Sequence, residues 1–332
     1  PPTIIFISFC FDSSIIASFT ESSLISPIIT FVSGILALKV WANFSLISSA
    51  TLVSKFGFLC SPYDIPPAPQ NKSNILNLTS LSHLRIARSK DGIHFEIDEH
   101  PAIFPLAEEE SWGMEDPRIT KIDDTYYINY TSVTENGAGT SLISTKDFCK
   151  FERHGIIFAP ENKDVTIFPR KINGKYVAFN RPVPSGIGNP QMWIAKSPDL
   201  IHWGEQRHFC GISSDTESWD DGRIGGGAVP FLTKKGWVKI YHAADRNDRY
   251  CLGAFLLDEK DPSIVLAKTK DPILEPKEEY EKKGFFGEVV FTCGCLVKDN
   301  KVIIYYGAAD DKICRADFEL DDLFATMEYV DI

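Results

Sequence analysis

The chain has 332 residues, 44% of them hydrophobic and 12% aromatic, and its formal net charge is -11 at pH 7. This composition indicates a folded protein with a large core in one or two domains and excludes a disordered chain. The negative charge argues against nucleic acid or an anionic membrane as a general partner, although a local basic pocket could still bind a small anion.

Eight cysteines are scattered along the chain, and no spacing among them repeats a zinc-binding pattern. In a chain of this length, scattered cysteines favour reduced and buried thiols. No metal cluster and no Ser-His-Asp triad can be assembled from the ordered motifs. We therefore expect a cytoplasmic protein without a metal site.

Residues 1–75 differ from the rest of the chain, because they are rich in Ser, Ile, Phe and Leu and poor in charge. Residues 24–41 form an apolar run close to membrane-spanning length, but Pro27 and Lys39 interrupt it, so a membrane location is not favoured. The prolines of residues 61–75 indicate a linker or an irregular crossing.

Two short patterns recur from about residue 81 onward. In the first, a Ser or Thr is followed two residues later by Asp, as in Ser89 and Asp91, and we expect each such Asp to accept hydrogen bonds from nearby backbone N–H groups of a surface turn. The second is a turn followed by alternating aromatic residues, with copies at residues 124–130, 174–180, 236–242 and 300–306. Repeats roughly 50–70 residues apart, with period-two alternation and no long helical period, are typical of propeller blades.

The predicted fold is therefore all-β, a five-bladed β-propeller whose first blade is atypical or incomplete. The four aromatic units account for four blades, and a strand pair within residues 82–97 is half of another, whose partner strands must precede residue 82. We expect two regions: an atypical N-terminal segment at 1–75, which could complete the first blade, and the propeller domain at 76–332.

The stretch 111–118 combines the side chains that sugar chemistry needs. Glu115 and Asp116 supply carboxyl groups for proton transfer, Trp112 supplies a ring face on which a sugar can stack, and Arg118 supplies a cation that can order the acid. Pro117 predicts an extended backbone at Asp116. Alone, the stretch could equally be a solvated turn with an Asp–Arg pair.

With these motifs in order, the chain from about 82 to 320 resembles glycoside hydrolase family 130. The matching stretches are 115–119, 162–165, 168–176, 180–182, 223–227, 240–242 and 306–310. The resemblance implies a five-bladed propeller that acts on β-mannosides with inversion, in most members by phosphorolysis and in some by hydrolysis. It does not extend to residues 1–75.

The resemblance implies a role for each matched polar residue. It places the general acid at Asp116, with the proton passing through a sugar hydroxyl. It implies phosphate binding by five residues: Lys163, Arg181, Arg223, His242 and Tyr250. Asp164 maps beside them but cannot donate as a carboxylate, and it joins the expected substrate-binding residues, which are Trp112, Glu115, Asp164, Asp221 and Asp245.

Glu288 decides between two reactions, because it falls where phosphorylases of the family usually carry asparagine. A carboxylate there would repel phosphate and could instead activate water as the base of an inverting hydrolase. Asp221 and Asp245 are further candidates for that base. The retained cations favour phosphorolysis of a β-mannoside oligosaccharide to mannose 1-phosphate, with inorganic phosphate as co-substrate and no cofactor. A hydrolase, and a non-catalytic propeller that binds glycans, are the alternatives; a homo-oligomer is left open.

The run Gly225 to Gly227 lacks the spacing and the following helix of a nucleotide-binding loop. We expect these glycines to let the backbone pass close to a ligand or to a neighbouring strand.

Overall fold

The computed structural model describes residues 3–9, 28–31, 37–39 and 82–330. Most of the predicted N-terminal segment, including most of the apolar run 24–41, lies outside these residues. No helix within the described residues is long and apolar enough to cross a membrane.

The described chain is built from antiparallel sheets. One sheet contains β6 (Met114–Ile122), β7 (Thr125–Thr134), β8 (Gly137–Thr145) and β9 (Glu152–Phe158). The next contains β10 (Asn162–Ile167), β11 (Tyr176–Pro182), β12 (Met192–Ser197) and β13 (Gly204–Cys210). The third contains β14 (Arg223–Gly226), β15 (Phe231–Thr233), β16 (Gly236–Ala244), β17 (Tyr250–Leu257), β18 (Val265–Thr269) and β22 (Met327–Tyr329). The fourth contains β19 (Val290–Lys298), β20 (Lys301–Ala308) and β21 (Lys312–Glu319).

Two smaller sheets precede these four in the chain. One contains β1 (Thr3–Phe9), β4 (His83–Ser89) and β5 (Glu96–Ile97), and the other contains β2 (Ile28–Phe31) and β3 (Ala37–Lys39). The helices are short: η2 (Glu108–Glu110), α1 (Glu279–Lys282) and α2 (Leu320–Ala325).

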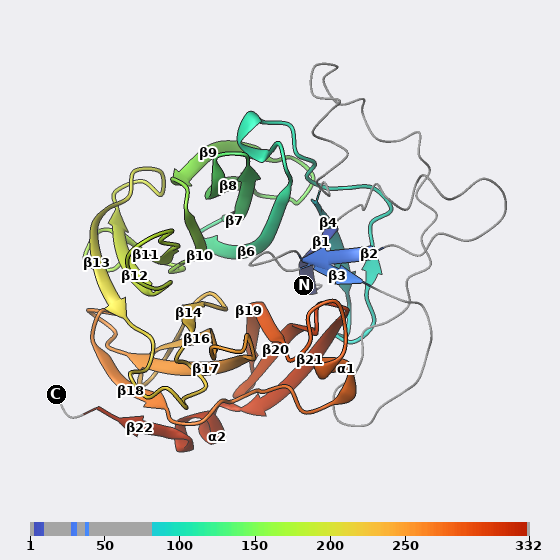
Figure 1. Ribbon diagram of the computed structural model, residues 1–332. Helices are drawn as coiled ribbons and strands as arrows, with labels where there is room; N and C mark the ends of the chain where they lie inside the picture. Colours follow the sequence, from blue (N-terminus) through green and yellow to red (C-terminus); the bar gives the residue numbers. More distant parts are fainter. Residues whose placement is uncertain (1–2, 10–27, 32–36, 40–81, 331–332) are drawn as a thin grey trace.

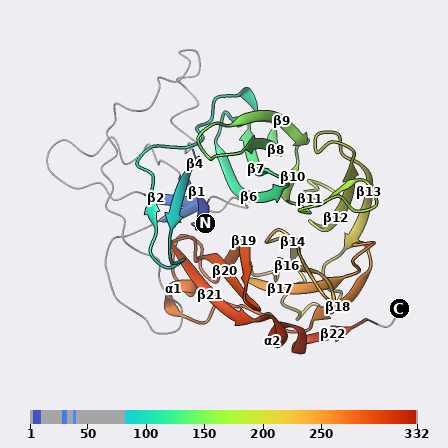
Figure 2. The ribbon, with the colours of Figure 1, turned by 180° about the vertical axis from the view of Figure 1, so that it is seen from behind.

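The sheets are arranged around a common centre, as a propeller requires (Figures 1 and 2). The strands β6, β10, β14 and β19 lie nearest the centre, and β9, β13 and β18 lie outside. The all-β prediction and the propeller-like arrangement are confirmed. Each predicted aromatic unit coincides with the strand that pairs with an inner strand: β7, β11, β16 and β20.

The inner strands β6, β10 and β14 begin at the same end of the ring as their partner strands end, as the strand register shows. Lys163 near the start of β10 pairs with Arg181 near the end of β11, and Gly225 in β14 pairs with His242 in β16. Glu115 in β6 pairs in the same way with Thr131. We call this end the N-terminal face; it carries the loops that precede the inner strands and those that follow their partners.

The core lies between neighbouring sheets, which clusters of buried hydrophobic side chains join. Phe168 and Phe179 pack against Trp237 and Phe255 between the second and third sheets. A separate cluster joins the third and fourth sheets and is covered by Leu323 of α2.

The Ser/Thr-x-Asp prediction is confirmed at Asp91, Asp147 and Asp199, and it stays a prediction at Asp271, the weaker fourth copy. The Oδ1 atom of Asp91 accepts the N–H groups of Ile93 and His94, both at 2.8 Å. Asp147 and Asp199 each accept the equivalent pair of N–H groups at 2.8–3.0 Å. The residue after each Asp is left-handed, with φ of 73° at Gly92, 56° at Phe148 and 73° at Leu200.

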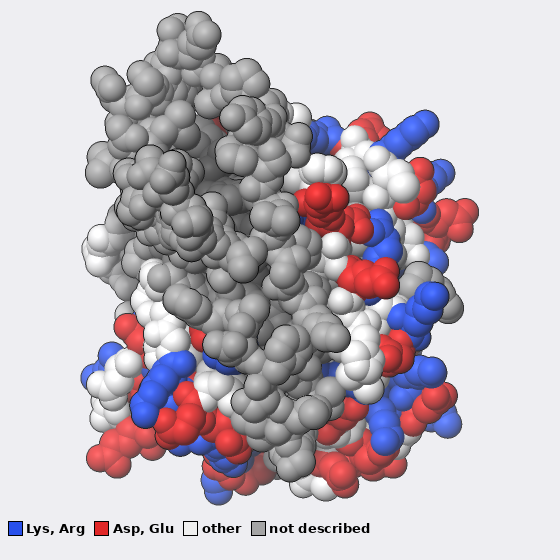
Figure 3. Space-filling view, turned by 90° about the vertical axis from the view of Figure 1, so that its right-hand side faces the viewer, with Lys and Arg blue, Asp and Glu red and all other residues white. Residues whose placement is uncertain are grey.

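The β4–β5 turn contacts the fourth sheet. The Gly92 carbonyl accepts the Tyr305 hydroxyl at 2.7 Å and Nη1 of Arg315 at 3.0 Å. The rings of Phe95 and Tyr305 meet edge to face with centroids 5.5 Å apart. On the face shown in Figure 3, acidic and basic side chains of the described residues are interspersed, without a large area of one sign.

Candidate active site

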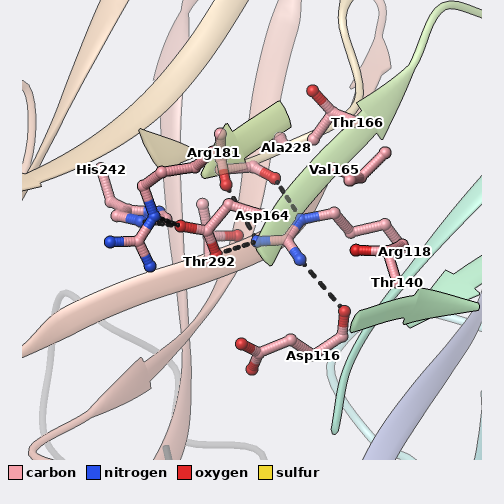
Figure 4. A network of polar contacts seen from close by, with 12 residues as sticks. Asp116, Arg118, Thr140, Asp164, Val165, Thr166, Arg181, Ala228, His242 and Thr292 are labelled. Carbon is pink, nitrogen blue, oxygen red and sulfur yellow. Dashed lines mark hydrogen bonds and ion pairs between the residues drawn. The ribbon is translucent and has the colours of Figure 1, made fainter. Parts of the chain in front are cut away.

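Four charged or polar side chains from four strands meet at the centre of the ring (Figure 4). Oδ2 of Asp164 lies 2.6 Å from Nε of Arg181 and 3.0 Å from Nε2 of His242, and Oδ1 accepts Nη2 of Arg118 at 3.3 Å. All four residues are buried. Residues 118, 164, 181 and 242 are far apart in sequence, so only the ring brings them together; we call them the central cluster.

Asp116 and Asp164 each lie in a β-bulge, which sets the direction of the side chain. Pairing slips between Glu115 and Arg118 in β6, and between Lys163 and Thr166 in β10, and each slip contains a left-handed Asp, with φ of 48° at Asp116 and 56° at Asp164. A bulge redirects a side chain locally, and Asp tolerates the left-handed region better than most residues. The extended backbone predicted for Asp116 from Pro117 is therefore wrong, because the bulge overrides the local preference.

Arg118 occupies the centre and ties three inner strands together. Its Nε donates to the Gly227 carbonyl at 3.0 Å and Nη2 donates to the Gly226 carbonyl at 2.9 Å. Nη1 donates to the backbone carbonyl of Asp116 at 3.1 Å. With its bond to Asp164, this buried guanidinium has partners on every side, so its role is to fix the cluster's geometry.

Gly225 lies directly against the central cluster. A Cβ atom at this position would be 2.6 Å from Nε2 of His242 and closer still to Oδ2 of Asp164. At Gly226 a Cβ would be 2.5 Å from the Asp164 carbonyl oxygen. The expectation that these glycines permit close backbone approach to a neighbouring strand is confirmed.

Burial and ion pairing act in opposite directions on the cluster. Burial would raise the pKa of Asp164, but Arg181, His242 and Arg118 hold it well below its usual range. Burial lowers the pKa of His242 to about 4, although Asp164 beside it acts in the opposite direction. At neutral pH, Asp164 is thus ionised and His242 is a neutral ring that donates through Nε2, which leaves Nδ1 as an acceptor.

Glu115 and Asp116 form a buried acid pair. Oδ1 of Asp116 and Oε2 of Glu115 have no hydrogen-bond partner among the described residues. Burial raises the pKa of Asp116, partly offset by Arg118, and burial raises the pKa of Glu115 to about 8 despite the charge of Lys163. A carboxyl group with a raised pKa is suited to act as a general acid near neutral pH.

The carboxyl group of Asp310 is a site feature that sequence reasoning missed. Its side chain is fully buried, and neither oxygen has a hydrogen-bond partner among the described residues. Burial, with a further contribution from Asp116, raises its pKa well above the usual range. The available signal was positional: Asp310 follows the end of β20, as His242 stands near the end of β16.

Lys239 is a second missed residue, buried completely in β16. Its Nζ donates to Oγ1 of Thr166 at 2.8 Å and to the Ala228 carbonyl at 2.6 Å. Burial lowers its pKa well below the usual value. Alternation alone predicted this position as an ordinary strand residue, so the sequence held no signal for a buried cation.

Arg223 and Tyr250 lie beside the cluster on the same side as His242. The Arg223 guanidinium is 5.3 Å from the centre of the Tyr250 ring, and that ring is 6.0 Å from the His242 ring. Arg223 also pairs with Asp248, whose side chain is 68% exposed. Because an exposed ion pair of this kind is weak, an incoming anion can compete for Arg223.

The remaining predicted site residues lie at the edge of this arrangement. Asp221 accepts the Arg246 N–H at 3.1 Å, and Asp245 accepts the N–H groups of Asn247 and Arg249 at 2.8 and 3.0 Å, so both carboxylates shape the turn after β16. The side chain of Glu288 is 46% exposed and lies 3.9 Å from Nε of Arg249.

Trp112 precedes β6 on the N-terminal face. Its backbone N–H donates to the Val133 carbonyl at 2.8 Å. Within the described residues, no group of three His, Cys, Asp or Glu side chains could hold a metal ion. The buried carboxyl group of Asp116 lies near the cationic side chains of Arg118, Lys163 and Arg181.

Comparison with known proteins gives a family match over most of the chain. The family model for glycoside hydrolase family 130, described as beta-1,4-mannooligosaccharide phosphorylase, matches residues 75–329. The chain is 51% identical over 251 residues to a beta-1,2-mannobiose phosphorylase of Listeria innocua, covering 76% of this chain and 70% of the relative. It is 43% identical over 246 residues to a 1,2-beta-oligomannan phosphorylase of a Thermoanaerobacter species, covering 73% of this chain and 80% of the relative.

A solved structure of the Listeria innocua enzyme in complex with beta-1,2-mannobiose superposes with a TM-score of 0.72, covering 74% of this chain and 69% of that chain.

Proposed function

The chain belongs to glycoside hydrolase family 130, and we propose that it cleaves β-mannosidic bonds by phosphorolysis with inversion, releasing mannose 1-phosphate. The observation that carries the proposal is the position of Asp116. Its buried carboxyl group has an unpartnered oxygen, and its backbone carbonyl is linked through Arg118 to Asp164, Arg181 and His242.

In the proposed reaction, the protonated carboxyl group of Asp116 supplies the proton that the departing sugar oxygen needs, relayed by a hydroxyl of the bound mannose. A phosphate oxygen attacks the anomeric carbon from the opposite face as the glycosidic C–O bond breaks. The configuration inverts, so a β-mannoside gives α-mannose 1-phosphate and an oligosaccharide shorter by one mannose. Asp116 ends as a carboxylate and regains its proton from solvent.

Phosphate binding is assigned to Lys163, Arg181, Arg223, His242 and Tyr250. Figure 4 shows the terminal nitrogens of Arg181 on the far side of its guanidinium from Asp164, where they can meet an anion. Burial raises the pKa of Tyr250, which keeps its hydroxyl protonated as a donor. Nδ1 of neutral His242 can accept a hydrogen bond from the O–H group of bound hydrogen phosphate, and the contact between Nε2 and Asp164 fixes the ring for that contact.

Trp112, Glu115, Asp164 and Asp310 are assigned to the sugar side of the site. The buried, unpartnered oxygens of Glu115 and Asp310 call for donors, and the hydroxyl groups of a mannose ring are donors of suitable size. We assign a β-1,2-linked substrate because the relatives at 51% and 43% identity act on 1,2-linked mannosides.

An inverting hydrolase with Glu288 as base is the second candidate. A base for water attack must lie within hydrogen-bond or one-water reach of the reacting carbon. The Glu288 side chain is half-exposed and lies near Arg249, so it is poorly suited to act as the base. The cations Lys163, Arg181 and Arg223 are better suited to bind phosphate, so we favour phosphorolysis. Asp221 and Asp245 are less suited still, since each accepts backbone hydrogen bonds in one turn.

We also propose that the β1–β4–β5 sheet is a fifth blade, since it contacts β6 on one side and the last sheet on the other. Residues 76–332 would then form the propeller domain, and part of 1–75 would complete its first blade. Inorganic phosphate is the only co-substrate the reaction needs, and a cytoplasmic location stays a prediction.

The decisive experiment incubates the full chain with β-1,2-mannobiose and β-1,4-mannobiose, with and without inorganic phosphate, and identifies products by NMR. We expect α-mannose 1-phosphate from the 1,2-linked substrate only when phosphate is present. Free mannose without phosphate would establish the hydrolase instead. No product under any condition, together with measurable oligosaccharide binding, would make the protein a glycan-binding propeller.

A further inference from the structure

The segment between α1 and β19 exposes two adjacent aromatic rings. The Phe285 and Phe286 side chains are 42% and 36% exposed, and within residues 82–330 they are the exposed phenylalanines. Their rings meet edge to face with centroids 5.1 Å apart. Exposing paired apolar rings to water is unfavourable, so such a pair marks a contact surface for something else.

The segment that carries the two rings precedes an inner strand and so belongs to the N-terminal face, where the central cluster is. The segment leads directly into the inner strand β19, which begins at Val290. Two residues after the segment, the Phe291 ring lies 4.4 Å from the His242 ring. The segment therefore borders the proposed active site.

The backbone of this segment is fixed at both ends. Before it, the buried Glu281 accepts the N–H groups of Lys277 and Glu278, both at 2.8 Å, and the Tyr306 hydroxyl at 2.7 Å. After it, the Val289 N–H donates to the Glu281 carbonyl at 3.1 Å. A ligand thus meets a segment whose backbone is already held near both ends, which reduces the entropy cost of binding.

The same segment touches both sides of the site. The Phe286 N–H donates to the Ala309 carbonyl at 3.3 Å, next to the buried Asp310. On the other side, the Tyr250 N–H donates to the Glu288 carbonyl at 2.9 Å. A Cβ atom at Gly284 would be 2.8 Å from Cβ of Ala309, so this glycine is needed for the close approach.

We infer that Phe285 and Phe286 form a distal subsite that binds a further mannose ring of a β-linked oligosaccharide of three or more units. The inference rests on the proposed function and adds to it a preference for chain length. The face of a pyranose ring carries C–H groups, and an aromatic ring packs against such a face without needing a hydrogen bond. The polar groups near Asp116 serve the bond that is cleaved, whereas this apolar pair suits a ring beyond it.

The test compares kcat/KM for β-1,2-mannobiose and β-1,2-mannotriose, with phosphate saturating, in the wild type and in Phe285→Ala, Phe286→Ala and the double variant. We expect the double variant to lose roughly fivefold to tenfold on the trisaccharide, the size of one aromatic packing contact. The disaccharide should change less than about twofold by the same argument. Phe285→Tyr and Phe286→Tyr should keep the trisaccharide value, because each retains a ring.

Ile156→Ala is the matched control, since Ile156 is 40% exposed on the outer strand β9. Unchanged trisaccharide kinetics in the double variant would overturn the inference, and so would equal losses on both substrates. If the wild type cleaves neither substrate, calorimetric binding of mannotriose to the same variants replaces kinetics. Weaker binding in the double variant then supports the subsite although the proposed function fails, whereas unchanged or undetectable binding overturns it.

Discussion

Nε2 of His242 lies 3.0 Å from Oδ2 of Asp164, and both side chains are 98–99% buried, as their exposures of 1% and 2% show. This contact joins β16 of the third sheet to β10 of the neighbouring second sheet. Together with Arg118 and Arg181, it keeps an ionised carboxylate and a neutral imidazole in the most buried part of the site. The charge state of each group therefore depends on contacts between the first, second and third sheets.

Lowering of the His242 pKa gives a prediction about acid stability. The pKa falls from 6.5 unfolded to about 4 folded, so the stability it contributes is present above pH 6.5 and is lost as pH falls through 4. In NMR, the His242 ring resonance is assigned as the one that disappears in His242→Gln. In the wild type this resonance should not titrate near pH 6.5. Urea denaturation gives the free energy of unfolding of the wild type and of that variant. The difference between the two should decrease by on the order of 2–3 kcal/mol as pH falls from 6.5 to 4. A His242 midpoint near 6.5 would contradict the prediction.

Asp116→Asn should reduce turnover by about two orders of magnitude or more, because an amide cannot donate the proton of a general acid. Oligosaccharide affinity should change by less than about fivefold, since the two side chains have the same shape. Turnover and calorimetric binding together check this, with Asp271→Asn as the same exchange at an exposed residue. Unchanged turnover would remove Asp116 from the mechanism.

The pH profile of kcat/KM should have an alkaline limb set by Asp116. Burial raises the pKa of this carboxyl group, and the acid must be protonated to act, so activity persists above the usual range for Asp and falls as pH rises through the raised pKa. In Asp116→Asn, the pH profile of the residual kcat/KM should lack this alkaline limb. A profile that rises steadily with pH would instead indicate a general base and support hydrolysis.

Glu115→Gln should stabilise the protein at neutral pH. The pKa of Glu115 rises from 4.5 to about 8 on folding, so the folded state prefers the protonated form, and ionisation costs stability increasingly as pH rises from 4.5 to 8. The variant cannot ionise, so at pH 7 it should gain on the order of 2–3 kcal/mol relative to wild type, and at pH 4.5 almost none. Urea denaturation at both values measures the difference, and an equal effect at both would be inconsistent with this cause.

Gly225→Ala should disrupt the central cluster, because its Cβ would be 2.6 Å from Nε2 of His242. We expect a loss of about 2–4 kcal/mol in stability and of most activity. Gly204→Ala is the control, since nothing lies within 4 Å of a Cβ there. Thermal melting and turnover of both variants, measured in parallel, test whether the close approach is required; near-wild-type activity in Gly225→Ala would show that it is not.

The sequence by itself determined the β-strands, the turns and the family. Alternation and turn chemistry are local, so the aromatic units and the Asp91, Asp147 and Asp199 turns could be located without coordinates. The matched stretches, taken together and in order, were specific enough to identify the family, which the family match confirms. The roles of the individual site residues stay predictions.

Tertiary structure alone decided which groups share the centre and in which charge state. The left-handed backbone of Asp116 arises from a bulge that overrides the preference set by Pro117, and the burial of Lys239 and Asp310 arises from packing between sheets. The pKa of His242 falls because the closed ring removes water from it. These properties depend on contacts between residues distant in the chain, and local sequence preferences carry no information about such contacts.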